Sequence, residues 1–115
     1  MTRLLHITER TSWAAALETG RYRTSTRGVS LDEQGFIHCS LPHQLRAVAE
    51  YVYGDADDLV VLVIDSERLD VRVEYEIPEP GAEKFPHIYG PVPTDAVTEV
   101  LPVERDAQGR MLLPE

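Results

Sequence analysis

Three short segments of the sequence carry a histidine followed two residues later by a hydroxyl side chain. The pairs are His6 and Thr8, His38 and Ser40, and His87 and Tyr89. An imidazole titrates near neutral pH and can donate, accept or transfer a proton. Hydroxyl groups hydrogen-bond the oxygens of a ribose or a phosphate, and aromatic rings stack on flat ligands. These residue types predict a site for a nucleotide-like ligand.

The elements expected to position these residues are strands over residues 4–8, 35–40 and 85–89. Side chains alternate along a strand, so each histidine shares a face with its hydroxyl residue. A single histidine on a strand is usually structural, but three in matched contexts favour one shared cleft. Alternation places Cys39 on the face opposite His38, so a packed thiol is favoured over an activated nucleophile.

The remaining segments predict an α+β fold. Residues 11–19 form a helix capped by Thr11 or Ser12, and residues 45–53 have the apolar spacing of a second helix. Ser40 is expected to cap that second helix. We expect residues 26–34 to form a loop. Extended segments are expected at 22–25, 59–64, 71–75, 97–103 and 111–113. Helices that precede a run of strands favour a small, mostly antiparallel sheet in a single domain over residues 1–115.

Charge and composition exclude several classes of function. The chain has 20 acidic and 11 basic residues and a net charge of −9, which disfavours DNA and RNA as partners. Arg21, Arg23 and Arg27 form a basic cluster that is either a solvated loop or part of a ligand site. With one cysteine, no intramolecular disulfide can form. No run has transmembrane length and the first residues lack a signal-peptide pattern, so we expect a cytoplasmic protein that binds no membrane.

A metal site is the competing use of the histidines. Their spacing is not that of a zinc finger or ribbon, and no His-Glu-x-x-His motif occurs. We therefore expect no metal. The alternative hypothesis is a metal-dependent hydrolase that uses His6, His38 and His87. The sequence also contains no P-loop and no dinucleotide-binding glycine fingerprint.

Several motifs resemble those of the bacterial family catalogued as domain of unknown function 952. They are His6-Ile7-Thr8, Trp13, Gly20, Tyr22, Gly35-Phe36-Ile37-His38-Cys39-Ser40, the run from Leu59 to Asp65, and Phe85-Pro86-His87-Ile88-Tyr89-Gly90-Pro91. This resemblance implies a fold similar to the ADP-ribosyltransferases, with a split sheet, two main helices and a cleft. In those enzymes a first-strand histidine and a hydroxyl residue hold the ribose of NAD, and His6 and Thr8 match that pattern.

The leading hypothesis is binding of NAD or another ADP-ribose-type nucleotide, with ADP-ribosyl or phosphate transfer as the reaction. His38 and His87 are the expected catalytic groups, and Ser40 is expected to contact or position the ligand. Tyr89 would stack on a ring, and Arg21 or Arg23 would meet the diphosphate. Many such transferases use a late glutamate, for which Glu74 and Glu76 are candidates by composition alone. A non-catalytic nucleotide-binding or accessory module that has lost transferase chemistry is therefore the second hypothesis.

Overall fold

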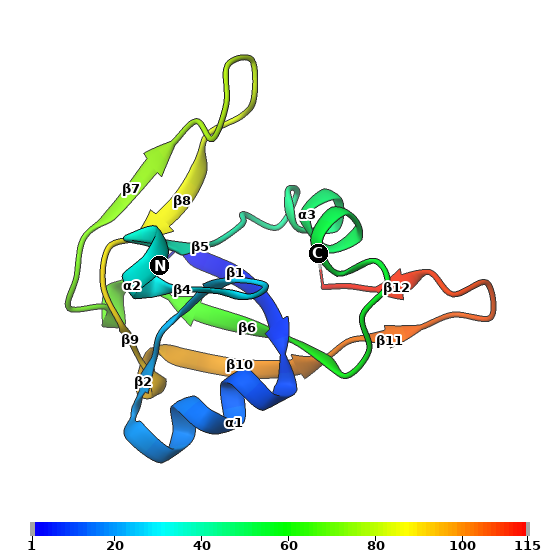
Figure 1. Cartoon of the computed structure of the whole chain (residues 1–115), viewed down its shortest axis with the longest axis horizontal. Coiled ribbons are helices and arrows are strands. Elements are labelled where there is room, and N and C mark those ends of the chain that lie inside the picture. Colours follow the sequence, from blue (N-terminus) through cyan, green and yellow to red (C-terminus); the bar gives the residue numbers. More distant parts are fainter. Residues whose placement is uncertain (1, 115) are drawn as a thin grey trace.

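A three-stranded antiparallel sheet, in the order β1-β6-β10, lies at the centre of the structure (Figure 1). Its strands are β1 (Arg3–Glu9), β6 (Leu59–Asp65) and β10 (Val97–Pro102). Every residue of β6 is buried, because it is the middle strand and both faces of the sheet are covered. This burial explains its unbroken apolar sequence. The structure, a computed structural model, describes residues 2–114.

Different elements cover the two faces of this sheet. Helix α3 (Leu45–Tyr53) and strand β12 (Met111–Leu112) pack against the face that carries Leu5 and Ile7. Helix α1 (Arg10–Thr19) and a second sheet contribute to the core on the face that carries Leu4. Period-two alternation in β1 thus sends consecutive side chains into two separate cores.

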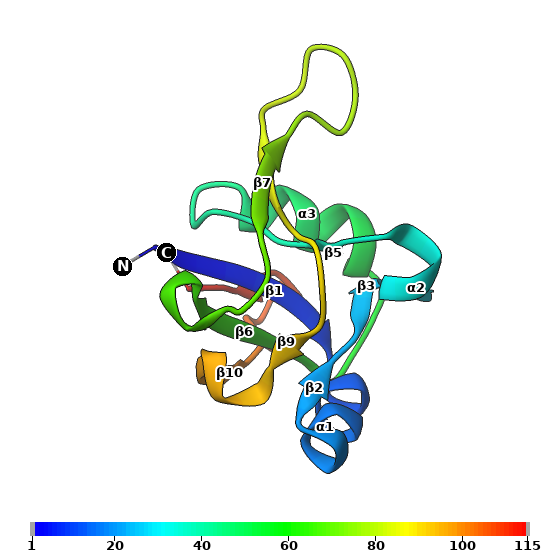
Figure 2. The same ribbon diagram turned by 90° about the vertical axis from the view of Figure 1, so that its left-hand side faces the viewer.

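The second sheet has the order β5-β8-β7 and is also antiparallel. It consists of β5 (Ile37–His38), β8 (Phe85–Ile88) and β7 (Val73–Glu76). The β7–β8 hairpin projects beyond the first sheet, and the loop of residues 77–84 lies at its tip (Figure 2). Two backbone hydrogen bonds of 2.8 and 2.7 Å between Leu5 and Ser40 join the two sheets. The chain that carries His38 is thereby fixed against β1.

Short elements complete the fold. They are β2 (Arg21–Tyr22) paired with β9 (Val92–Pro93), β3 (Thr24–Thr26) paired with β4 (Val29–Ser30), β11 (Glu104–Arg105) paired with β12, α2 (Leu31–Gln34), and the 3₁₀ turns Ser66–Arg68 and Thr94–Ala96. The strand pairs in the described residues are antiparallel. The predicted α+β class with mostly antiparallel sheets is confirmed.

The prediction of a loop over residues 26–34 is wrong. This segment contains β4 and the single-turn helix α2. Ser30 and Glu33 form a capping box, in which each side chain accepts a hydrogen bond from the other residue's backbone N–H. The Ser-x-x-Glu spacing was visible in the sequence. Gly35 ends the helix at a φ of 91°, a conformation that glycine adopts without steric cost.

The strand predicted over residues 35–40 is shorter than expected and lies at a sheet edge. Only Ile37–His38 pairs with β8 as a strand, and Ser40 forms an isolated bridge to Leu5. Ser40 therefore does not cap α3, which begins at Leu45, and the Gln44 side chain accepts the Leu41 N–H instead. Helix α1 begins at Arg10, one residue earlier than predicted. No side chain caps its start, whereas Thr11 or Ser12 was the expected cap.

Gly90 packs where no larger residue fits. A Cβ atom at this position would lie 2.5 Å from Cγ1 of Val71. We expect Gly90→Ala to lower the free energy of unfolding by about 1–3 kcal/mol, because the half-buried valine must be displaced. Urea denaturation measures this loss. Adding Val71→Ala should recover part of it, and two independent, additive losses would contradict a steric cause.

Candidate functional site

One face of the second sheet gathers histidines, aromatic rings and acids. The register pairs His38 with His87, Glu74 with His87, and Glu76 with Phe85. Paired residues of adjacent strands project to the same side of a sheet. His38 on β5 and His87 on β8 therefore lie together, with Glu76 of β7 diagonally opposite His87. The opposite face carries Cys39, which is buried in the core, and burial raises the pKa of its thiol.

These side chains form a hydrogen-bonded chain. Nδ1 of His38 lies 3.4 Å from Nε2 of His87, and Nδ1 of His87 lies 2.9 Å from Oε1 of Glu76. The Tyr89 hydroxyl donates to the same carboxylate oxygen. Hydrogen bonds from Tyr89 and His87 hold the pKa of Glu76 below its usual value, and Glu76 raises the pKa of Tyr89. Glu76 is thus the ionised end of an acid–imidazole–imidazole chain.

Sequence reasoning named Glu76 only by composition. Alternation in residues 71–76 places Glu74 and Glu76 on one face of their strand, but nothing local in the sequence gives the register against β8. The partner of His87 was therefore missed. Strand alternation puts Phe36 on the same face as His38, and its ring stacks on His87 with ring centroids 4.0 Å apart.

Tyr89 is held within this cluster on several sides. Its hydroxyl is bonded to Glu76, the guanidinium of Arg72 lies 4.2 Å from its ring centroid, and the Phe36 ring lies 5.6 Å away. A guanidinium over an aromatic face is an attractive contact. The side chain predicted to stack on a ligand therefore already has an arginine and a phenylalanine as neighbours.

An open groove lies beside this cluster. It has two sections of about 590 and 290 Å³, which share His38, Val52 and Pro78. The larger section is lined by His38, Ala47, Val48, Tyr51, Val52, Pro78, Glu79, Ala82, Glu83 and Phe85. The smaller is lined by Ser25, Thr26, Gln34, Phe36, His38, Val52, Pro78 and His87. Among the described residues that line the groove, none is lysine or arginine.

His38 is the residue at the junction of the two sections. Burial, together with the nearby His87, lowers the pKa of His38 to about 4, so its ring is neutral at pH 7. Nδ1 faces His87, and Nε2 forms no hydrogen bond with any of the described residues. His38 thus offers a neutral ring with one free nitrogen.

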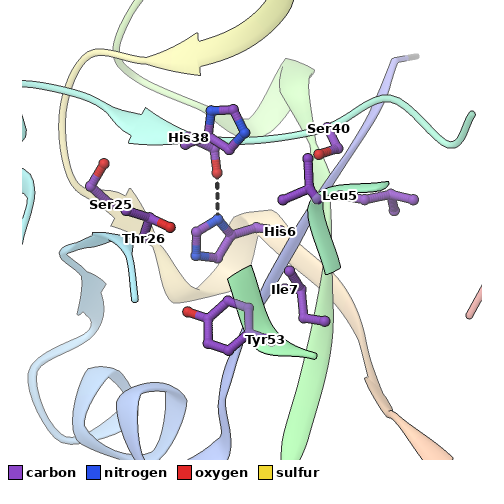
Figure 3. Close-up of a pocket in the computed structure, with 9 residues that line it drawn as sticks. Leu5, His6, Ile7, Ser25, Thr26, His38, Ser40 and Tyr53 are labelled. Atoms are coloured by element: carbon purple, nitrogen blue, oxygen red, sulfur yellow. Dashed lines mark hydrogen bonds between the residues drawn. The ribbon is translucent and has the colours of Figure 1, made fainter. Parts of the chain in front are cut away.

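His6 lies beneath the groove as a buried connector. Its Nδ1 lies 2.6 Å from the backbone oxygen of His38, shown as a dashed line in Figure 3. Its Nε2 lies 2.7 Å from the hydroxyl of Tyr22. Because a carbonyl can only accept, Nδ1 donates and Nε2 accepts from the tyrosine. Burial lowers the pKa of His6 to about 4. Both ring nitrogens are occupied, so His6 positions the backbone of β5.

The other predicted site residues lie in different places. Thr8 is buried in the interior, with 1% of its surface exposed, and it does not line the groove. Ser40 is also buried, and its side chain lines a small chamber next to His38. Arg21 and Arg23 line a separate depression beside α1, and Arg21 lies 3.5 Å from Asp70. The structure therefore brings His38 and His87 together at the groove, with His6 below, and does not bring the two arginines there.

The described side chains form no metal-binding cluster. Within residues 2–114, no group of three or more histidine, cysteine, aspartate or glutamate side chains could hold a metal ion. The hydrolase hypothesis required a ring nitrogen from His6, but both of these are hydrogen-bonded.

No helix in the described part of the chain is long and apolar enough to cross a membrane.

The fold and the groove define a small α+β domain with antiparallel sheets and a histidine-bearing cleft. This chain belongs to the family described as a protein of unknown function (DUF952), whose profile matches residues 7–100. The family predicted from the sequence is thus confirmed.

Solved structures of protein CC0527 from Caulobacter crescentus are similar to this chain. Its crystal structure is 30% identical, with a TM-score of 0.82, over 96% of this chain and 94% of that one. Its solution NMR structure is 32% identical, with a TM-score of 0.75, over 95% and 90%. No curated protein matches. The likeness to ADP-ribosyltransferases stays a prediction, because none of these matches concerns such an enzyme.

Proposed function

We propose that the groove binds a flat-ringed, nucleotide-like ligand, NAD or another ADP-ribose-type nucleotide, and that His38 and His87 act on it as acid–base groups. The observation that carries this proposal is the chain from Glu76 through His87 to His38, which ends at the junction of the two groove sections. Perturbed titratable groups in a cleft are typical of functional sites.

The hydrogen bonds assign the protons in this chain. The Glu76 carboxylate accepts, so His87 donates from Nδ1, and in the tautomer with its proton on Nδ1 it accepts at Nε2. His38 then donates from Nδ1 to His87. Nε2 of His38 therefore carries a lone pair and can take a proton from a ligand hydroxyl or from water. A carboxylate that orients an imidazole in this way fixes its tautomer and stabilises its cation.

The groove lining supports a ring or nucleoside portion of the ligand. Val52, Pro78 and Phe85 provide apolar walls, while Glu79 and Glu83 are the charged residues of the larger section. A diphosphate would find carboxylates there and no cation, and Arg21 and Arg23 line a different depression. We therefore propose that the nicotinamide-ribose end of NAD enters the groove and that the diphosphate projects into solvent.

A titration monitored by NMR tests ligand binding. Millimolar NAD, ADP-ribose and nicotinamide riboside are added separately to the ¹⁵N-labelled chain, with the histidine ring signals recorded. We expect the signals of His38 and His87 to move further than those of His43, which is 62% exposed at its side chain and is connected to the groove through Glu83. No movement with any of the three ligands contradicts the proposal.

The second candidate is a binding module without catalysis. The low pKa of His38, about 4, favours it, because a general base works best when its pKa lies near the working pH. Ligand binding with no release of nicotinamide over hours would identify the chain as such a module.

A further inference from the structure

The tip of the β7–β8 hairpin forms one wall of the larger groove section. Its loop, residues 77–84, contributes Pro78, Glu79, Ala82 and Glu83 to the lining, and α3 contributes the opposite wall. The loop projects beyond the first sheet (Figure 2), and none of its residues belongs to either core cluster of the described chain. The width of this groove section therefore depends on how the loop is held relative to α3.

Two neighbouring residues before α3 hydrogen-bond to this loop. Nε2 of His43 lies 2.8 Å from Oε1 of Glu83, but both side chains are more than 60% exposed, and such pairs contribute little. Nε2 of Gln44 donates to the backbone oxygen of Lys84 at 2.8 Å and lies 3.4 Å from Oε1 of Glu83. Gln44 is only 4% exposed. The buried amide is thus the stronger of the two attachments.

The partners of Gln44 fix the orientation of its amide. The Leu41 N–H donates to Oε1 at 3.0 Å, whereas the Lys84 carbonyl can only accept and so faces Nε2. The backbone N–H of Gln44 also donates to the Leu41 carbonyl at 2.9 Å, which closes a turn over residues 41–44. Ser40, directly before this turn, is joined to Leu5 of β1 by two backbone hydrogen bonds. The amide is therefore attached to the central sheet through a closed turn.

The burial of this glutamine needs a reason, because a buried amide is costly unless it is hydrogen-bonded. Its oxygen bonds the turn before α3, and its nitrogen bonds the chain directly before β8. Lys84 precedes Phe85, which lines the groove, and His87 lies two residues further along the same strand. The bond to the Lys84 carbonyl thus fixes the end of the strand that carries both residues.

We propose that Gln44 is a positioning residue of the groove. Its amide holds the base of the loop at Lys84 and thereby keeps the wall that the loop forms at a fixed distance from α3. The larger groove section is then preformed for the ring of a ligand, and a preformed site loses less conformational entropy on binding. The effect on ligand binding rests on the proposed function, whereas the attachment of the loop does not.

Gln44→Met tests this role, because it replaces the amide with an apolar side chain of similar length. We expect ¹⁵N relaxation to show residues 77–84 ordered in the unsubstituted chain and mobile in the variant, with the amides of β6 unchanged in both. The affinity for nicotinamide riboside should fall by about 5- to 30-fold, which corresponds to the loss of one or two hydrogen bonds. His43→Ala is the matched control, because it removes only the exposed attachment, and it should change both readouts far less.

Several outcomes would overturn the proposal. A loop that is equally ordered in Gln44→Met and the unsubstituted chain would do so, as would equal loosening in His43→Ala. A second readout needs no variant: we expect NOEs from the side-chain amide protons of Gln44 to the backbone protons of Lys84 and Phe85, and their absence contradicts the attachment.

The two proposals fail separately. If nicotinamide riboside binds neither protein, the choice of ligand is wrong, and the relaxation and NOE data still decide whether Gln44 holds the loop. If it binds both proteins equally tightly, the ligand-binding proposal stands and Gln44 does not position the groove.

Discussion

A fall in pH from 7.5 to 5 is expected to lower the free energy of unfolding by about 2 kcal/mol through His6 alone. Burial lowers the pKa of His6 in the folded chain to about 4, whereas an unfolded histidine titrates near 6.5. Between these values the unfolded chain binds a proton that the folded chain does not, so stability is fully present above pH 6.5 and is lost as the pH falls. His38, with its pKa also lowered to about 4, adds a loss of the same sign.

Urea unfolding at pH 7.5, 6.5, 5.5 and 5 measures this effect in the unsubstituted chain and in two variants. His6→Gln should show a shallower dependence on pH, because the buried titrating group is gone. His43→Gln is the matched control, because within residues 2–114 the exposed His43 is bonded to the exposed Glu83 and to no core residue. The lowered pKa values of Glu76 and Glu83 act mainly below pH 4.5, outside this window. An unchanged slope in His6→Gln would rule out His6 as the source.

Release of nicotinamide from NAD, if the groove is catalytic, is expected to fall by about 10²- to 10⁴-fold in His87→Ala. The substitution removes the imidazole that links Glu76 to His38, and with it the group that fixes the tautomer of His38. We expect a comparable loss in His38→Ala, which removes the free ring nitrogen itself.

Chromatographic measurement of nicotinamide in single-turnover reactions provides the readout. His43→Ala is the control, because it removes an exposed histidine that lies outside the cluster. Glu76→Gln should give an intermediate loss and a shifted pH profile, because an amide can orient His87 but cannot stabilise its cation. If the unsubstituted chain releases nicotinamide and His87→Ala does so equally fast, His87 is not part of the mechanism.

Local sequence patterns predicted most elements of the fold. The apolar run of β6, the amphipathic spacing of α3 and the strand that carries His6 each appear in the structure where they were expected. The strands that carry His38 and His87 are shorter than predicted. These patterns are reliable because each reflects which faces of one element are buried. The errors lie where helix capping or strand pairing overrides the intrinsic preference of a short segment. The segment with the capping box of α2 was predicted to be a loop, and Ser40 pairs with Leu5 instead of capping α3.

In the candidate site, too, local patterns predicted some features and the pairing of distant strands decided the others. By itself, the sequence determined which side chains share a face of each strand, and therefore that His38 and Cys39 point in opposite directions. Only the tertiary structure decided which strand faces meet. The antiparallel register of β5, β8 and β7 placed His87 between His38 and Glu76. The packing of other elements buried His6 against Tyr22 and left Arg21 and Arg23 in a separate depression. Pairing between distant strands depends on the packing of the whole chain, and no local spacing encodes it.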